Sequence, residues 1–317
     1  MISIIYPVCN VGNYLEKSLQ SLLNQDFTDF EIIAVNDGST DDSLSVIKKF
    51  ASKDSRIKVY DQENQGVAAT RYKALKNAKG KYVSFVDSDD VLPENALSLL
   101  YNSLINNDSD ISEGNYCKVF PSGEISNYEF PSEKVVTAEQ NIDLLLSRRV
   151  IYSLCAKLFK KSLFINAELK KFVYLEDFCL AVQAFARAKK ISLVNQCVYN
   201  YIQRHDSAVH SHYGDRAVAD HYFSRLWIVD YIKDNFQSYN NLAMLDGFLL
   251  QGYTYAVCYG GKKYFSDFDY KRCKLIFDEH KVMLPIGQRI VFQTIPFGIL
   301  NKISIWLYQI RLKNAKR

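Results

Sequence analysis

The chain has 317 residues, of which 48% are hydrophobic and 23% are charged, so it holds enough apolar material for one large domain or two smaller ones. Its net charge of +4 is too small to indicate nucleic acid binding, and we expect no nucleic acid partner. Seven cysteines without a C-x-x-C pair argue against a disulfide framework and favour reduced thiols in a cytoplasmic protein.

The amino terminus runs directly into a β-type segment, so we expect no secretory leader. A membrane-spanning helix is not expected either, because no stretch approaches about 18 uninterrupted apolar residues.

The amino-terminal part of the chain alternates apolar β-type runs with amphipathic helical runs. The predicted strands are Ser3–Val8, Glu31–Val35, Arg56–Tyr60 and Tyr82–Val86, and the predicted helices are Asn13–Gln25, Ser39–Ala51 and Val67–Ala78. Asn13 and Glu16 have capping-box spacing, and Ser39 or Thr40 can cap the second helix. This alternation predicts an α/β fold with a mostly parallel sheet in a three-layer arrangement.

Polar groups cluster where these strands end. Tyr6–Asn10, Asp37 and Asp87–Asp90 each follow a predicted strand. Because ligands of parallel α/β sheets bind beyond the carboxyl ends of the strands, the fold is expected to bring these groups together.

The segment KYVSFVDSDD, from Lys81 to Asp90, carries the sharpest chemical signal. Asp87 and Asp89 are two residues apart, so they should point to the same side as the strand leaves the sheet. Two neighbouring carboxylates repel unless a cation lies between them. We therefore predict a divalent metal with oxygen ligands, Mn or Mg, that also binds a phosphate group.

This segment has two other interpretations. An EF-hand is excluded because Leu92 and Ser98 stand where that loop needs glycine and glutamate. A solvated acidic turn that caps a helix near Pro93 is the plain alternative. No glycine-rich dinucleotide fingerprint and no P-loop occur, which favours a nucleotide whose base and ribose are read by acids and whose diphosphate is held by metal.

Further elements follow. Pro121–Gly123 lies in a predicted hairpin, Thr137–Gln140 is a capping box for a helix to about Ser147, and a helix covers Phe178–Ala188. Val198–Gln203 is another predicted strand.

Four motifs carry a family resemblance, and they occur in the family's order. They are SIIYPVCNVGNYLEKSLQSLLNQ, VNDGSTDDS, NQGVAATRYKAL and YVSFVDSDD. The chain resembles the inverting glycosyltransferases of family 2, which have the GT-A fold. The resemblance is dense over residues 1–110 and thinner through Ala156–Leu158 and Leu175–Asp177 to about Ser211.

The resemblance implies a UDP-hexose donor and a set of donor-binding residues. Pro7 and Val8 would pack along the nucleotide, and Asp37 would accept the uracil N–H. Asp87, with Ser88 beside it, would contact the ribose.

The resemblance also implies roles for the metal and the diphosphate. Asp89 would bind the metal together with Asp87, and Asp90 is a further candidate ligand. Arg71 matches a basic residue near the base and phosphate, although Thr70 and Tyr72 depart from the family's usual Ala-Arg-Asn. Without the resemblance, Arg71 could equally be a surface arginine paired with an acid.

Inverting transfer needs a base that removes the proton of the acceptor hydroxyl. Asp177 matches the family's base, and Glu176 would orient it or touch the acceptor. The plain alternative is that this pair only complements a helix dipole. Arg204, His210 and Lys157 are candidates for contact with the diphosphate, with an ordinary polar surface loop as the alternative.

The carboxyl-terminal part is predicted to be helical. We divide the chain into a GT-A catalytic domain, residues 1–212, and a helical domain, residues 213–317. Lys281–Arg317 contains seven Lys or Arg and no Asp or Glu. Its apolar end, Ile303–Leu312, fits either the inner face of the cell membrane or packing within the domain or in a homo-oligomer.

The prediction is thus an inverting, metal-dependent hexosyltransferase. Its acceptor would be a saccharide, a glycoprotein or a lipid-linked glycan, as in bacterial polysaccharide or glycoprotein glycan synthesis. The alternatives are a nucleotidyltransferase of related fold, disfavoured because no basic glycine-rich loop follows the first strand, and an inactive protein that binds sugar nucleotides.

Overall fold

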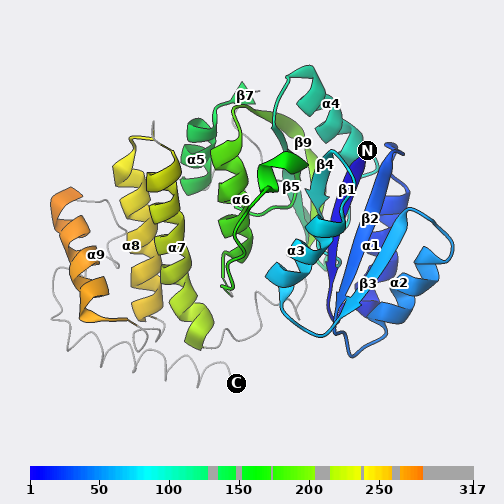
Figure 1. The fold of residues 1–317 in the computed structure, drawn as a ribbon, viewed down its shortest axis with the longest axis horizontal. Coiled ribbons are helices and arrows are strands. Elements are labelled where there is room, and N and C mark those ends of the chain that lie inside the picture. Colours follow the sequence, from blue (N-terminus) through cyan, green and yellow to red (C-terminus); the bar gives the residue numbers. More distant parts are fainter. Residues whose placement is uncertain are drawn as a thin grey trace.

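The protein is described by a computed structural model that covers residues 1–127, 135–147, 152–172, 174–203, 215–236, 239–258 and 265–280. A sheet flanked by helices forms one side of the molecule, and a group of helices forms the other (Figure 1).

Four parallel strands begin the sheet. They are β1 (Ile2–Val8), β2 (Phe30–Asp37), β3 (Ile57–Gln62) and β4 (Tyr82–Phe85), in the spatial order β3-β2-β1-β4. Their connections run through α1 (Gly12–Leu23), α2 (Ser43–Ala51) and α3 (Val67–Asn77). The predicted alternation of strands and helices is confirmed, and the parallel arrangement gathers the carboxyl ends of the strands at one edge.

Beyond β4 the sheet becomes mixed. β8 (Lys157–Lys160) pairs antiparallel with both β4 and β5 (Ile111–Val119), and β9 (Ile191–Ile202) runs parallel to β5. The short strands β6 (Ile125–Asn127) and β7 (Val135–Val136) pair antiparallel with β5 and β9. β5 and β6 form the hairpin predicted around Pro121–Gly123.

The remaining helices complete the layers. They are α4 (Ala96–Asn106), α5 (Ala138–Leu146), α6 (Glu176–Arg187), α7 (Asp215–Asn235), α8 (Leu242–Cys258) and α9 (Asp267–His280). Residues on β1 alternate between the two faces of the sheet. Ile4 belongs to an apolar cluster with α1 and α4, and Ile5 to one with α3 and α6. The predicted three-layer fold is therefore confirmed.

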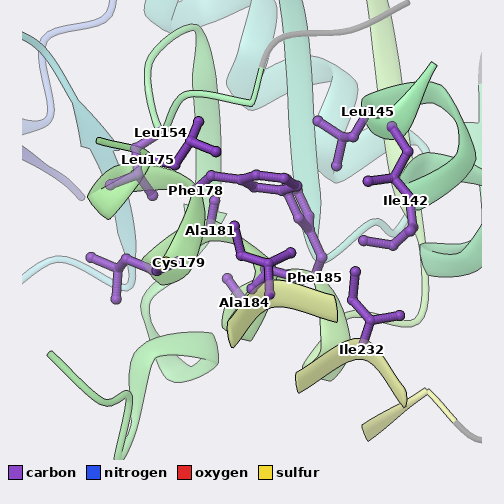
Figure 2. Packing of buried hydrophobic residues seen from close by; sticks show 14 of the residues in the cluster. Ile142, Leu145, Leu154, Leu175, Phe178, Cys179, Ala181, Ala184, Phe185 and Ile232 are labelled. Atoms are coloured by element: carbon purple, nitrogen blue, oxygen red, sulfur yellow. The ribbon is translucent and has the colours of Figure 1, made fainter. Parts of the chain in front are cut away.

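Helix α6 connects the sheet to the helical region. Its buried Phe178 and Phe185 lie near Ile142 and Leu145 of α5 and Ile232 of α7 (Figure 2). The same apolar cluster extends from the sheet into α7 and α8, so the core is continuous across the proposed boundary at residue 212.

Two of the three predicted helix caps are wrong. The Thr137–Gln140 capping box forms as predicted. Helix α1 instead begins at Gly12 after Val11, and α2 at Ser43 after Asp42, and in neither helix does the side chain of the capping residue accept a hydrogen bond from the first turn. Ser39 contacts the loop after β1 instead, because its Oγ accepts a hydrogen bond from the Asn10 N–H.

The cysteines differ in part from the prediction of reduced thiols. Cys117 on β5 and Cys197 on β9 form a disulfide, whereas Cys9, Cys155, Cys179 and Cys273 are free. Sequence separation hid this pair, because the two cysteines are 80 positions apart and only the pairing of β5 with β9 brings them together.

Among the described helices, none combines the length and the apolar character that crossing a bilayer requires. Arg204, His210 and the basic segment Lys281–Arg317 lie outside the described residues.

Candidate active site

The acidic segment after β4 forms a tight turn. β4 ends at Phe85, and the Asp90 N–H donates to the Asp87 carbonyl at 3.1 Å. The predicted strand-like alternation of Asp87 and Asp89 therefore does not apply. Asp87 and Asp89 are partly exposed beyond the sheet, whereas Asp90 is buried.

Arg71 joins this turn to helix α6. Its Nη2 lies 2.9 Å from Asp87 Oδ1, and its Nη1 lies 3.0 Å from Glu176 Oε1. The residue is 5% exposed, so the alternative of a surface arginine is wrong. Burial opposes its charge, but the neighbouring carboxylates outweigh burial and raise the pKa of Arg71 above its ordinary value.

The first turn of helix α6 carries two carboxylates, Glu176 and Asp177. Leu175, just before the helix, has a φ of +60°, a left-handed conformation that is uncommon for a residue of this size. This bend directs the chain so that Glu176 and Asp177 begin the helix, where its dipole favours negative charge. The ion pair of Glu176 with Arg71 shows that these acids do more than complement the dipole.

The pKa values of both acids are raised. Burial, assisted by repulsion from Asp177, raises the pKa of Glu176 to about 7 against the opposing effect of Arg71. Burial also raises the pKa of Asp177, and Arg71 and a hydrogen bond with the Ser153 side chain partly counteract it. Perturbed carboxyl groups of this kind are typical of functional sites.

Sequence reasoning missed two residues that contact these acids. The Ser153 side chain is close enough to Asp177 to lower the pKa of its carboxyl group, and the Cys155 thiol lies 3.5 Å from Asp87 Oδ2. Both lie in the segment before β8, and no motif or periodicity marked them.

Other candidates have structural contacts of their own. Both carboxylate oxygens of Asp37 accept hydrogen bonds of 2.8–2.9 Å. The donors are the side chain of Gln62 at the end of β3 and the N–H groups of Gln65 and Gly66 in the loop before α3. Pro7 and Val8 are buried at the end of β1. Ser88 is also buried, and Tyr6 donates to its carbonyl at 3.5 Å.

Asp90 attaches the acidic turn to β9. Its Oδ2 accepts a hydrogen bond from the Tyr199 hydroxyl at 2.7 Å, and its Oδ1 accepts one from the Ile202 N–H at 2.8 Å. The Tyr199 hydroxyl also accepts from the Asp87 N–H at 3.1 Å. Tyr199 is a further residue that sequence reasoning missed, and it fixes the turn from β9.

Lys157 does not reach the site surface. It is completely buried and forms an ion pair with Glu113 at 2.9 Å. The prediction that it contacts a diphosphate is therefore wrong, because a completely buried ammonium group cannot meet a ligand at the surface of the site.

The described residues contain no group of three or more His, Cys, Asp or Glu arranged to hold a metal on its own. Burial raises the pKa of Asp90, and Asp89 and Asp87 both lie close enough to this carboxyl group to raise it further. Such a set of oxygen donors fits a hard cation whose other ligands come from phosphate and water.

The arrangement combines a carboxylate suited to proton removal, a fixed guanidinium and an acidic turn suited to a metal–diphosphate group. Asp177 could serve as a base because its raised pKa increases its affinity for a proton. Together these groups could support displacement of a phosphorylated leaving group by a hydroxyl.

Comparison with known proteins agrees with this geometry. Residues 3–165 match the family model for glycosyl transferase family 2. The glycosyltransferase GlyG of Streptococcus pneumoniae serotype 4 is 30% identical over 223 residues, which are 67% of this chain and 74% of GlyG. GlyA of the same organism is 34% identical over 209 residues, 63% of this chain. The match spans only 30% of the length of GlyA.

A solved structure shares the fold. The structure of residues 1–349 of TarS from S. aureus in complex with UDP-GlcNAc has a TM-score of 0.68 and 21% sequence identity, and the alignment covers 99% of this chain and 91% of that one. This likeness supports the predicted α/β class and extends through the helical region.

Proposed function

Because the chain belongs to glycosyl transferase family 2, we propose that it transfers a hexose from a UDP-sugar to a hydroxyl group of its acceptor, with inversion at the anomeric carbon. The observation that carries the proposal is the contact of Arg71 with both Asp87 and Glu176 beside Asp177. This contact joins the end of β4, where a donor would bind, to the start of α6, where a base is needed.

The donor-binding part of the proposal uses the carboxyl ends of β1, β2 and β4. Pro7 and Val8 would line the nucleotide, Asp37 would meet the base, and Asp87 with Ser88 would meet the ribose. The complex of TarS with UDP-GlcNAc supports a UDP-sugar as the donor class. Arg71 uses both of its Nη atoms on carboxylates, so in our proposal it chiefly orients Asp87 and Glu176.

Asp89, together with Asp87, would hold a Mn or Mg ion. Such an ion would act as a Lewis acid that stabilises the charge of the departing diphosphate. Asp90 has both oxygens engaged by Tyr199 and Ile202, so we assign it to shaping the turn.

The proposed step balances without an added reactant. Asp177 accepts the proton of the acceptor hydroxyl as that oxygen forms a bond to the anomeric carbon. The bond from this carbon to the UDP oxygen breaks, and UDP leaves with the electron pair. Attack from the side opposite the leaving group inverts the configuration.

The proposal extends to the acceptor and to the location of the protein. We infer a saccharide, glycoprotein or lipid-linked acceptor in bacterial polysaccharide or glycoprotein glycan synthesis. The residue 213–317 region would contact the acceptor, a second copy of the chain, or the cytoplasmic membrane surface through its basic end.

A panel of nucleotide sugars tests the proposal. Each is incubated with the protein and a mixture of saccharide acceptors in Mn²⁺, Mg²⁺ or EDTA, and released nucleotide is measured. In parallel reactions the protein is incubated with a nucleoside triphosphate and a sugar 1-phosphate, and released pyrophosphate is measured. We expect UDP release from one UDP-sugar in the presence of metal. Pyrophosphate release would instead indicate a nucleotidyltransferase, and no release from any sugar would support the inactive binding protein. Retained anomeric configuration in the product, measured by NMR, would contradict inversion.

A further inference from the structure

A buried ion pair contacts the segment that precedes β8. Lys157 on β8 and Glu113 on β5 are opposite each other in the antiparallel pairing of these strands, and both are 0% exposed. The distance from Lys157 Nζ to Glu113 Oε1 is 2.9 Å. Lys157 is thus an enclosed cation that the proposed reaction does not use.

The ammonium group of Lys157 also binds the chain just before β8. It donates to the Ser153 carbonyl at 2.8 Å and lies 3.4 Å from the Cys155 carbonyl. This segment is tightly bent, since Ala156 has a φ of +57° and the Cys155 N–H donates to Ser153 Oγ at 3.0 Å. One buried cation therefore fixes the carbonyls on both sides of Leu154.

The side chains of the same two residues face the site. The Ser153 side chain is close enough to Asp177 to lower the pKa of its carboxyl group, and the Cys155 thiol lies 3.5 Å from Asp87 Oδ2. A continuous series of contacts thus runs from Lys157 through Ser153 and Cys155 to both carboxylates.

Stability alone is a weak explanation for such a pair. Removing two charges from water costs several kcal/mol per ion by general estimates, and apolar pairs of similar volume often stabilise a fold as well or better. What an apolar pair cannot do is donate hydrogen bonds to the Ser153 and Cys155 carbonyls.

We propose that Lys157, held by Glu113, is a positioning residue for the transfer reaction. It fixes residues 153–155 so that Ser153 orients Asp177 and Cys155 supports Asp87. This inference rests on the proposed function, because the groups that it positions are the proposed base and a proposed donor ligand.

The test replaces both charges at once. In the Glu113→Leu/Lys157→Met variant the core stays filled and no charge is left unpaired, so we expect a melting temperature close to that of the wild type. Misplaced catalytic groups should lower kcat by about 100-fold, with KM for the UDP-sugar within about twofold because most of the donor contacts proposed above are untouched. A kcat equal to that of the wild type would overturn the proposal.

Lys160→Met is the matched control. Lys160 lies on the same strand and forms an ion pair with Asp110 at 2.7 Å, and none of its contacts reach residues 153–155. We expect its kcat to stay near the wild-type value. An equal loss of kcat in both variants would overturn the proposal, because disturbance of β8 would then explain the effect.

Two further measurements keep the proposal decidable. If the double variant does not fold, Ser153→Ala removes the hydroxyl that contacts Asp177 and leaves the buried pair intact. We expect its kcat to fall about tenfold, the size of one lost hydrogen bond to a charged group. Unchanged kcat in this variant would overturn the proposal.

Hydrogen exchange provides a readout independent of activity. Amides of residues 153–156 should exchange faster in the double variant than in the wild type, while those of β5 and β8 stay protected. If the wild type transfers no sugar, the proposed function fails, yet this measurement still decides whether Lys157 fixes the segment. Unchanged exchange would overturn that role.

Discussion

Where β4 ends and α6 begins, Arg71 lies between Asp87 and Glu176, with Asp177 next along the chain. In the helical region, by contrast, His221 lies between two tyrosine rings. The ring centroid of His221 is 3.5 Å from that of Tyr174 and 3.9 Å from that of Tyr255. Burial, with Arg225 nearby, lowers the pKa of His221 to about 3. At the site, burial shifts a pKa in the opposite direction and raises that of Glu176 to about 7.

The two regions therefore respond oppositely to pH. Glu176 and Asp177 have raised pKa values in the folded state, so their contribution to stability is fully present below their unfolded pKa and is lost as pH rises through the folded pKa. His221 has a lowered pKa, so its contribution is present above about 6.5 and is lost as pH falls towards 3. The site thus holds carboxylates whose charge opposes folding at neutral pH, as expected of functional groups, and the helical region holds a neutral ring.

Asp177→Asn should give the largest effect. The amide cannot accept the acceptor proton, so we expect kcat to fall by about 1,000-fold while UDP binding, measured by calorimetry, stays within about threefold. Asp54→Asn is a matched control, because Asp54 forms its ion pair with Arg56 beside β3, away from α6. Full transfer activity in Asp177→Asn would assign the base to another residue.

Metal removal should have the next largest effect. With EDTA, or in Asp89→Asn, we expect transfer to fall by about 100-fold, because the departing diphosphate loses its Lewis acid. Mn²⁺ added back should restore the EDTA-treated wild type and leave Asp89→Asn low. Transfer that survives EDTA would remove the metal role of Asp89.

A smaller loss is expected in Arg71→Lys. Lysine keeps the charge but is a single point donor, so it cannot span Asp87 and Glu176 as the guanidinium does. We expect kcat to fall about tenfold, equivalent to one charge-assisted hydrogen bond at the low end of its range. Arg56→Lys, which changes an arginine outside the site, should be close to wild type, and equal activity of both variants would contradict the bridging role.

The sequence predicted the features that depend on local pattern. Apolar periodicity located β1–β4 and their helices, and the strand-end rule placed Asp87 near the other polar termini. Thr137 and Gln140 formed their capping box because that motif is complete within four residues. The Glu176–Asp177 pair was located through a family resemblance.

Long-range pairing set the rest. β8 has only four residues, so its own pattern could not indicate that it pairs with both β4 and β5. That pairing brings Ser153 and Cys155 to the site and encloses Lys157. Tyr199 reaches Asp90 across 109 residues, which no local spacing could reveal.

The smallest expected effect tests the pH comparison itself. Asp177→Asn removes a carboxyl group with a raised pKa, so its urea unfolding midpoint should decline less than that of the wild type as pH rises from 4 towards 8. His221→Phe keeps a ring between the two tyrosines and removes the titrating group, so its midpoint should decline less as pH falls below about 6.5. The direction of each change follows from the raised pKa of Asp177 and the lowered pKa of His221. Transfer by His221→Phe should stay within about twofold of the wild type, because the ring lies in the packing of α7 rather than among the carboxylates. If both variants followed the wild-type pH curve, the opposite titration of the two regions would be refuted, and the buried carboxylates would have to be explained without a cost to folding.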